Sequence, residues 1–402
     1  MALTVLYQPK SIDFARNNLV VRVKSSLTPP AGADHYVLVN ISLEIMYGGG
    51  TVPIPEFRVH FNASGIADVR DFGQIAMEYF RRHPAAPSSA VVPQVLPSPF
   101  ITCLMSFTDV VDGQESGELS LGPWRLINGR VNASEYPGFD LRSRLSAVQG
   151  YLSNSPDNIY TYKGAEHFLY FLNPGSGNAQ VRVVMYGDGD LDGDRYESPL
   201  VSLGDGEVLV VPVSRLIGEL PVEPSYVEVQ VVTDSGSVIG RPKTFWFNTP
   251  ELYSRTLLFL NRYGVFDTVT GVTLSNKFAV KDNAAVRSLP PDYLAQAGDY
   301  VQDDASEEDS FEFETGPVTM EMAQHCKELI ASRSAYLQVP GGWVRVLISA
   351  GNVSIFDDEK DLQTVKLKYS PAFSDDHINH SLVLPEVDQE DYSMEYLKTD
   401  YK

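Results

Sequence analysis

Alternation of apolar and polar residues is the feature that most constrains the fold of this chain. From Val37 to Ile45 every second residue is Val, Ile or Leu, and the residues between them are mostly polar. The glycines Gly48–Gly50 follow, and the alternation returns from Phe57 to Phe61. A period of two places alternate side chains on the same face of a strand, so these segments predict an antiparallel pair with one buried face.

Helical periodicity is confined to two short stretches. The first is expected from Asp71 to Arg82, because Asp71 and Gln74 have the spacing of a capping box and apolar residues then recur at helical intervals. This helix should end at His83–Pro84, before a proline-rich loop. The second helix, at about 318–332, is predicted from a stripe of Met322, Ala323, Cys326, Leu329 and Ile330. The expected fold is therefore mainly β, with two short helices.

Two polar, turn-rich stretches, Ser153–Asn158 and Asn248–Pro250, divide the chain. At 402 residues it is also longer than one ordinary domain of about 150 residues. We therefore expect multidomain β-sandwiches. The predicted parts are an N-terminal β-sandwich with one helix and a Pro-rich loop (1–152), a middle β-sandwich (153–250), a C-terminal β-rich domain with an acidic loop and one helix (251–385), and an acidic C-terminal arm (386–402).

Charge and composition argue against several classes of partner. The net charge of −21 disfavours nucleic acid, because phosphate recognition depends on Lys and Arg. No run of eighteen apolar residues is present, so no membrane span is predicted. The stretch Met1–Lys10 lacks the pattern of a secretory signal, and Cys103 and Cys326 are expected to be buried free thiols.

Two segments resemble parts of metal sites. Asp188–Asp194 has acids at alternating positions, as in the first half of a calcium-binding EF-hand loop, but Pro199 stands where the bidentate Glu is needed. We therefore expect a polar turn that binds no calcium. Asp375–His380 places two histidines beside two carboxylates, with no obvious further ligand, and a solvated loop is expected. No metal or other cofactor is predicted.

The sequence contains none of the short motifs that mark common active sites. It has no Gly-x-Ser-x-Gly elbow, phosphate-binding loop or His-Glu-x-x-His motif. His325 directly precedes Cys326, but adjacent residues on a helix point apart. The chain is therefore predicted not to be an enzyme. A glycosidase-type pair of carboxylates remains as an alternative, because such pairs have no fixed spacing in sequence.

Two acidic segments carry apolar residues that are candidates for interface anchors. Asp299–Glu314 contains eight acids and is expected to be a loop, with Phe311 and Phe313 as its anchors. The acidic arm carries Tyr392, Tyr396 and Leu397. Neither segment buries enough apolar area alone to offset its ordering entropy, so we expect both to order against a neighbouring subunit.

Five strand-rich stretches at the two ends of the chain carry a family resemblance. They are Val5–Pro9 leading into Asn17–Val23, Ala67–Phe72, Leu258–Thr268, Trp343–Ile348 and Leu367–Phe373. These stretches resemble tail-tip and baseplate structural proteins of phages and prophages of Bacteroides-like gut bacteria. The resemblance leaves the middle domain and the arm uncovered, and it carries over no catalytic residue.

The resemblance implies a structural virion protein of a phage tail or tail-like particle. Such a protein would assemble in the host bacterial cytoplasm into an oligomeric ring near the tail tip or baseplate. Its partners would be copies of itself and other tail proteins, and a carbohydrate receptor is a further candidate. The alternative is a carbohydrate-binding surface protein or adhesin that uses Tyr and Trp platforms, since the chain contains 21 Tyr and 3 Trp residues.

Overall fold

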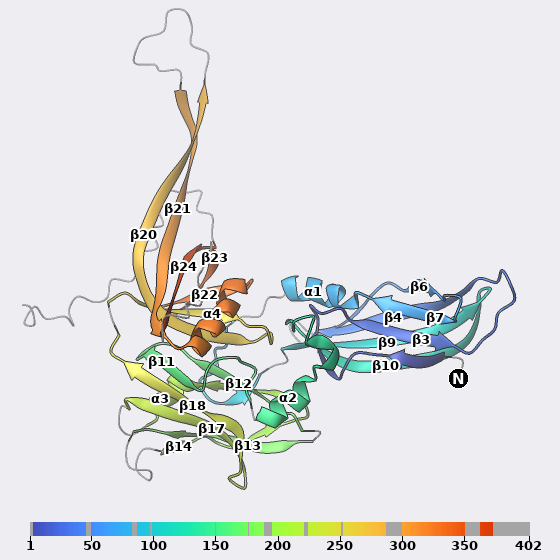
Figure 1. The fold of residues 1–402 in the computed structure, drawn as a ribbon, viewed down its shortest axis with the longest axis horizontal. Coiled ribbons are helices and arrows are strands. Elements are labelled where there is room, and N and C mark those ends of the chain that lie inside the picture. Colours follow the sequence, from blue (N-terminus) through green and yellow to red (C-terminus); the bar gives the residue numbers. More distant parts are fainter. Residues whose placement is uncertain are drawn as a thin grey trace, which may run out of the picture.

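The computed structural model confirms a mainly β, multidomain fold, with 54% strand and 12% helix. The strands form three units (Figure 1). The structure describes residues 3–45, 50–82, 87–96, 99–148, 150–175, 177–188, 195–220, 224–250, 252–286, 300–349 and 362–372.

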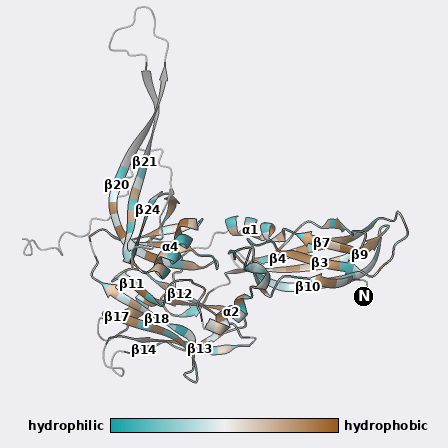
Figure 2. Ribbon diagram, viewed as in Figure 1, coloured by the Kyte–Doolittle hydropathy of each residue, from teal (hydrophilic) through white to brown (hydrophobic). Residues whose placement is uncertain are grey.

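The N-terminal unit is a sandwich of two sheets. One sheet has the order β1-β3-β7, and the other has β2-β10-β9-β4-β5 with β6 also paired to β4. Hydrophobic and hydrophilic residues alternate along these strands (Figure 2), and the apolar ones fill the space between the sheets. The strands are β1 (Leu3–Tyr7), β2 (Ile12–Phe14), β3 (Val20–Ser25), β4 (His35–Ile45), β5 (Gly50–Pro53), β6 (Phe57–His60), β7 (Ile66–Arg70), β9 (Phe100–Val111) and β10 (Gln114–Ile127).

Helix α1 (Phe72–Arg82) confirms the first predicted helix, and its buried Phe72, Ala76 and Met77 join the core of the sandwich. Helix α2 (Leu141–Val148) was not predicted from the sequence. The sequence did contain a signal for its start, since Asp140 is a residue type that favours the N-cap position. In the structure Asp140 Oδ1 accepts a hydrogen bond from the Ser143 backbone N–H at 2.8 Å, as an N-cap does. A short 3-10 helix, η1 (Tyr136–Gly138), lies between β10 and α2.

The middle unit is built from two sheets, one with the order β11-β18-β17-β13-β14 and β15 paired to β13. The other sheet, β12-β16-β8, takes its edge strand from the proline-rich stretch far upstream, so that stretch also contributes to the middle unit. The elements are β8 (Gln94–Val95), β11 (Asn158–Tyr162), β12 (Phe168–Leu172), β13 (Ala179–Tyr186), β14 (Arg195–Glu197), β15 (Val201–Leu203), β16 (Val208–Pro212), α3 (Val213–Ile217), β17 (Tyr226–Thr233) and β18 (Val238–Asn248).

The C-terminal unit is a closed barrel with the order β19-β20-β21-β24-β23-β22. Helix α4 (Met320–Ala331) confirms the second predicted helix, and the Thr319 hydroxyl caps it by accepting from the Met322 N–H at 3.4 Å. Its apolar face packs into the barrel core together with Phe259 and Leu367. The strands are β19 (Ser254–Leu260), β20 (Phe266–Val286), β21 (Tyr300–Val318), β22 (Ala335–Val339), β23 (Gly342–Ser349) and β24 (Gln363–Pro371).

The prediction that Asp299–Glu314 forms a loop is wrong, because residues 300–314 lie in strand β21. The prediction that Phe311 and Phe313 anchor a neighbouring subunit is also wrong. The two side chains are only 3% and 0% exposed and lie in the core of their own barrel. The reason is a period of two in which Phe311 and Phe313 face inward while Glu312 and Glu314 face outward. The density of acids obscured that alternation.

One hydrophobic cluster joins all three units. Phe14 of the N-terminal unit, Tyr170 of the middle unit and Tyr263 of the barrel all belong to it. Two glycines permit this close approach. A Cβ at Gly129 would lie 2.1 Å from the Arg262 carbonyl oxygen, and Gly264, at φ +76, would place one 2.6 Å from Ile127 Cγ2. The units are therefore in direct contact at these loops.

Three sequence predictions fall outside the described residues. They concern most of the Asp188–Asp194 segment, the His377 and His380 pair, and the arm with Tyr392, Tyr396 and Leu397. Of the first segment, Asp188 is described, and its carboxylate accepts from the Ser225 backbone N–H at 2.9 Å. That contact lowers the pKa of Asp188 below its usual value.

Candidate functional site: a polar cleft where three units meet

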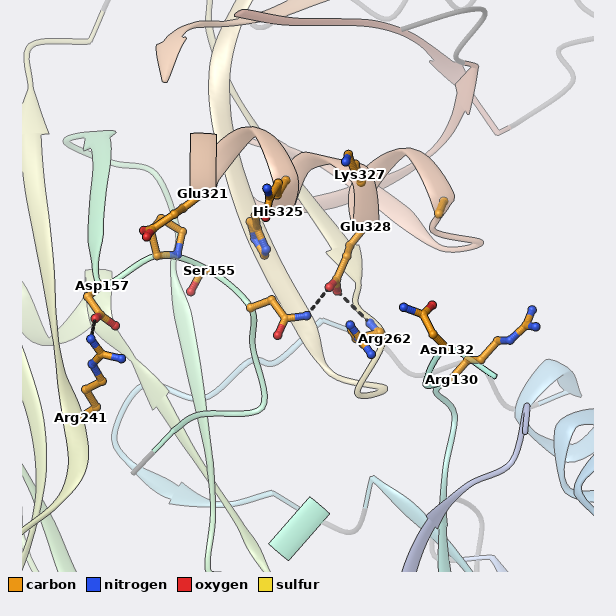
Figure 3. Close-up of a pocket in the computed structure, with 14 residues that line it drawn as sticks. Arg130, Asn132, Ser155, Asp157, Arg241, Arg262, Glu321, His325, Lys327 and Glu328 are labelled. Carbon is orange, nitrogen blue, oxygen red and sulfur yellow. Dashed lines mark hydrogen bonds and ion pairs between the residues drawn. The ribbon is translucent and has the colours of Figure 1, made fainter. Parts of the chain in front are cut away.

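A polar cleft of about 960 Å³ opens where the three units meet (Figure 3). The N-terminal unit contributes Arg130 and Asn132, the middle unit contributes residues 154–157 and Arg241, and the barrel contributes Arg262 and helix α4. Charged and polar side chains dominate this lining. The cleft is the candidate site because one of its lining residues, His325, belongs to a group of buried ionisable residues.

Lys243 is the buried cation of this group and is 4% exposed. Its ammonium group donates to the carbonyl oxygens of Ser155 at 2.6 Å and Pro156 at 2.9 Å, and it lies 3.4 Å from Asp157 Oδ1. Burial lowers the pKa of Lys243, and the nearby Asp157 carboxylate acts in the opposite direction. Lys243 thus ties strand β18 to the loop that enters the middle unit.

Asp267, near the start of β20, is the buried acid and is 4% exposed. Its Oδ2 accepts from the Ser153 hydroxyl and from the Asn261 amide, both at 2.9 Å. Burial raises the pKa of Asp267 to about 6, although both hydrogen bonds favour the carboxylate. Asp267 therefore links the barrel to the segment that precedes the middle unit.

His325 on α4 is the third buried group and is 1% exposed. Neither ring nitrogen has a hydrogen-bond partner in the described part of the chain, and Nε2 lies 3.7 Å from Asp267 Oδ2. Its ring packs against Phe259 at a centroid distance of 5.3 Å. Burial lowers the pKa of His325 to about 4, so the imidazole is neutral at neutral pH.

Glu328, one turn further along α4, connects the helix to two loops. Its carboxylate accepts from the Arg262 backbone N–H at 3.1 Å and from the Asn154 amide (Figure 3). The Tyr263 hydroxyl donates to Asn154 Oδ1 at 3.0 Å. These contacts lock α4, the Asn261–Gly264 turn and the entry to the middle unit into one arrangement.

The chemistry of this arrangement is that of a structural junction more than of an acid–base pair. Asp267 and His325 are adjacent and almost fully buried, although His325 lines the cleft, and a general acid or base must reach the atom whose proton it transfers. Two of the carboxylates that line the cleft are engaged by protein donors, Asp157 by Arg241 and Glu328 by Arg262 and Asn154. In the described residues, no three His, Cys, Asp or Glu side chains group as a metal site.

Sequence reasoning missed Lys243, Asp267 and His325 as members of a site. For His325 a signal existed, because it continues the buried stripe of α4 at Met322, Cys326 and Leu329. His325 and Cys326 are both buried, but His325 faces Asp267 whereas Cys326 lies in the barrel core. The contacts of Lys243 with Ser155 and of Asp267 with Ser153 join residues far apart in sequence, and the sequence held no signal for them.

Comparisons with known proteins identify no family. No family model and no curated protein sequence matches the chain. Among solved structures, trypsin-activated alpha-2-macroglobulin from Escherichia coli is similar at a TM-score of 0.21 and 10% sequence identity, over 91% of this chain. The match covers 21% of the macroglobulin chain, so this chain spans about a fifth of its length. None of the described helices is long and apolar enough to cross a membrane.

Proposed function

We propose that this chain is a structural subunit that assembles with copies of itself into a ring through the β20–β21 hairpin. The observation that carries the proposal is the length of that hairpin. Its register continues from Val272 opposite Glu314 to Val286 opposite Tyr300, far beyond the barrel (Figure 1). The resemblance of the sequence to phage tail-tip and baseplate proteins supports a particle of that kind.

The outer part of the hairpin is a two-stranded ribbon. β19 pairs with β20 only as far as Val272, and β24 pairs with β21 only from Phe311 inward. Beyond Lys277 and Ser310, no third strand joins the ribbon within the described residues. Ten residues of β20, from 277 to 286, extend this ribbon by roughly 34 Å at the usual rise per residue.

Such a ribbon gains stability when its edges are paired. An isolated two-stranded hairpin is marginally stable in water, and each open edge presents unpaired backbone N–H and C=O groups. One edge belongs to β20 and the other to β21, so the pairing of β20 of one copy with β21 of the next joins unlike edges. Contacts of that head-to-tail type close into rings when the rotation between copies permits.

The charges of the two strands both favour this pairing and limit its strength. The outer part of β21 carries Asp303, Asp304, Glu307, Glu308 and Asp309, whereas the facing stretch of β20 carries Lys277 and Lys281 with one acid, Asp282. The pairing of β21 of one copy with β20 of the next therefore joins stretches of opposite net charge. The surplus of acids opposes association at low ionic strength, so added salt should promote assembly.

The experiment compares the full chain with a variant in which residues 278–309 are replaced by a two-residue Asn-Gly turn. That turn closes the hairpin just beyond Lys277 and Ser310 and leaves the barrel register intact. Light scattering over a concentration series should show a defined oligomer for the full chain and a monomer for the short hairpin, with the same thermal melting of the monomers. A full chain that stays monomeric at all concentrations and salt levels, or a variant that assembles normally, would contradict the proposal.

A second candidate function, carbohydrate binding, is favoured by a row of aromatic side chains on the middle unit. Tyr160, Trp246 and Tyr226 occupy directly paired positions on the neighbouring strands β11, β18 and β17. Tyr160 is 56% exposed and Trp246 is 37% exposed, with their rings stacked at 6.4 Å. Exposed rings in one row offer flat apolar faces, with polar groups at their edges, on which a sugar can stack.

Glycan-array binding tests this candidate, with Tyr160→Ala and Trp246→Ala as the variants. Tyr253→Ala is the matched control, since Tyr253 is 55% exposed and lies outside the row. Glycan binding that is lost in the row variants and kept in the control would establish carbohydrate binding. Absence of binding to every glycan tested would leave the assembly proposal as the better account.

A further inference from the structure

Five arginines surround a second cleft, of about 430 Å³, between α1 and the barrel. Glu328 is the only acid that lines it among the described residues. This local excess of positive charge stands out in a chain whose net charge is −21. The arginines that define this arginine cleft are Arg16, Arg81, Arg130, Arg262 and Arg333.

Three of the five arginines have no ion-pair partner among the described residues. Arg16 donates to the neutral amide oxygen of Asn128 at 2.9 Å, and Arg130 and Arg333 form no ion pair with any described residue. Arg262 and Arg81 do have acidic partners, at 3.4 Å and 3.3 Å, but both of those contacts are long. Burial, together with the positive charges of Arg333 and Arg81, lowers the pKa of Arg16 to about 10.

A cleft of this kind suits a ligand with several carboxylates. Like charges held together repel, and a bound anion removes that repulsion. The arginine guanidinium presents a planar fork that binds a carboxylate through two parallel hydrogen bonds. The arginines come from two units, Arg16, Arg81 and Arg130 from the N-terminal unit and Arg262 and Arg333 from the barrel, so such a ligand would bridge the units.

We propose that the arginine cleft binds the acidic segment 386–397 of a neighbouring copy of this chain. That segment carries five acids and no Lys or Arg. Thirteen residues separate it from Ala372, the last residue described, and an extended stretch of that length reaches up to roughly 45 Å. The assignment to a neighbouring copy rests on the proposed function, whereas the binding of the segment does not. The five acids are Glu386, Asp388, Glu390, Asp391 and Glu395.

The binding test uses a fluorescein-labelled peptide of residues 384–402 and the full chain with those five acids changed to Gln or Asn, so that its own segment cannot compete. Anisotropy is read at a protein concentration where light scattering shows monomer. The variants Arg130→Glu and Arg333→Glu are suitable because both residues are exposed and lack ion-pair partners in the described structure. Arg345→Glu is the matched control, because Arg345 is exposed on β23 and does not line the cleft.

The expected result is saturable binding of the peptide, with an affinity that is at least tenfold weaker in each cleft variant and unchanged in the control. The affinity should also fall with added salt. A peptide with neutralised acids should not bind. Binding that is indifferent to Arg130 and Arg333 would overturn the proposal. So would a peptide that fails to bind while inorganic phosphate raises the melting temperature of the full chain, because the cleft would then be a site for small free anions. If copies still assemble when the peptide does not bind, this inference fails and the proposed ring stands.

Discussion

The carboxylate of Asp267 and the imidazole of His325 lie 3.7 Å apart inside the protein, and burial drives both toward their neutral forms. Asp267 belongs to β20 and His325 to α4, so the contact holds the first residues of β20 against the helix that follows the hairpin. At this distance the two groups do not share a hydrogen bond. Their effects on stability therefore have opposite dependences on pH.

Asp267→Asn should make the protein more sensitive to acid. The pKa of Asp267 rises from 3.8 to about 6 on folding, so its contribution to stability is complete below pH 3.8 and is lost as pH rises through 6. Acidification from pH 7 to 4 thus stabilises the wild type through this group, by on the order of 3 kcal/mol. The variant lacks that gain. Urea unfolding at pH 7.0, 5.5 and 4.5 should show a steeper loss of stability than in the wild type.

His325→Leu should have the opposite effect. The pKa of His325 falls from 6.5 to about 4 on folding, so its contribution is complete above pH 6.5 and is lost as pH falls through 4. A leucine does not titrate, so the variant does not lose stability on acidification through this residue. The substitution also removes two buried nitrogen atoms that have no partner in the described structure. The same urea series should show a shallower loss toward low pH than in the wild type. Equal pH dependences in the wild type and both variants would show that these groups do not titrate as described.

Gly129→Ala should weaken the contact between the N-terminal unit and the barrel. Its Cβ would lie 2.1 Å from the Arg262 carbonyl oxygen, and backbone must shift to make room. Overpacking of this kind costs roughly 1–3 kcal/mol. Gly138→Ala is the control, because a Cβ there meets nothing within 4 Å. A calorimetric melt in which the two variants are equally stable would count against the described junction.

Phe313→Ala should destabilise the isolated chain by about 3–5 kcal/mol, since Phe313 is fully buried in the barrel core. This result separates a core residue from a subunit anchor. An anchor would leave the unfolding of the monomer unchanged and would weaken assembly alone. Chemical denaturation at a concentration where the protein is monomeric makes the distinction.

The sequence predicted the elements whose signal is local and strongly periodic. The strand from His35 to Ile45 and the helices α1 and α4 each expose one face and bury the other, and their periods were visible. Strand β21 was not predicted because the eight acids between residues 299 and 314 obscured the alternation of Phe311 to Glu314. A run of acids indicates solvent on one face and says nothing about the other face.

The candidate site was beyond the reach of sequence reasoning for a different reason. Lys243, Asp267 and His325 come from β18, β20 and α4, and their relevant partners, such as Ser155 and Ser153, lie about 90 or more residues away. Contacts of that kind depend on how separate sheets pack, which local periodicity does not encode. The arginine cleft has the same origin, because its arginines are scattered along the chain from Arg16 to Arg333.

The central claim, that the hairpin edges pair between copies, is tested most directly by amide hydrogen exchange on residues 277–286 of β20. In the ribbon of a single copy, one edge of β20 has no strand partner among the described residues, so the outward amides exchange readily. The account predicts that these amides become protected in the oligomer, while amides of the barrel core around Phe259 exchange slowly in both states. An oligomer in which the outer amides of β20 exchange as fast as in the monomer would contradict it.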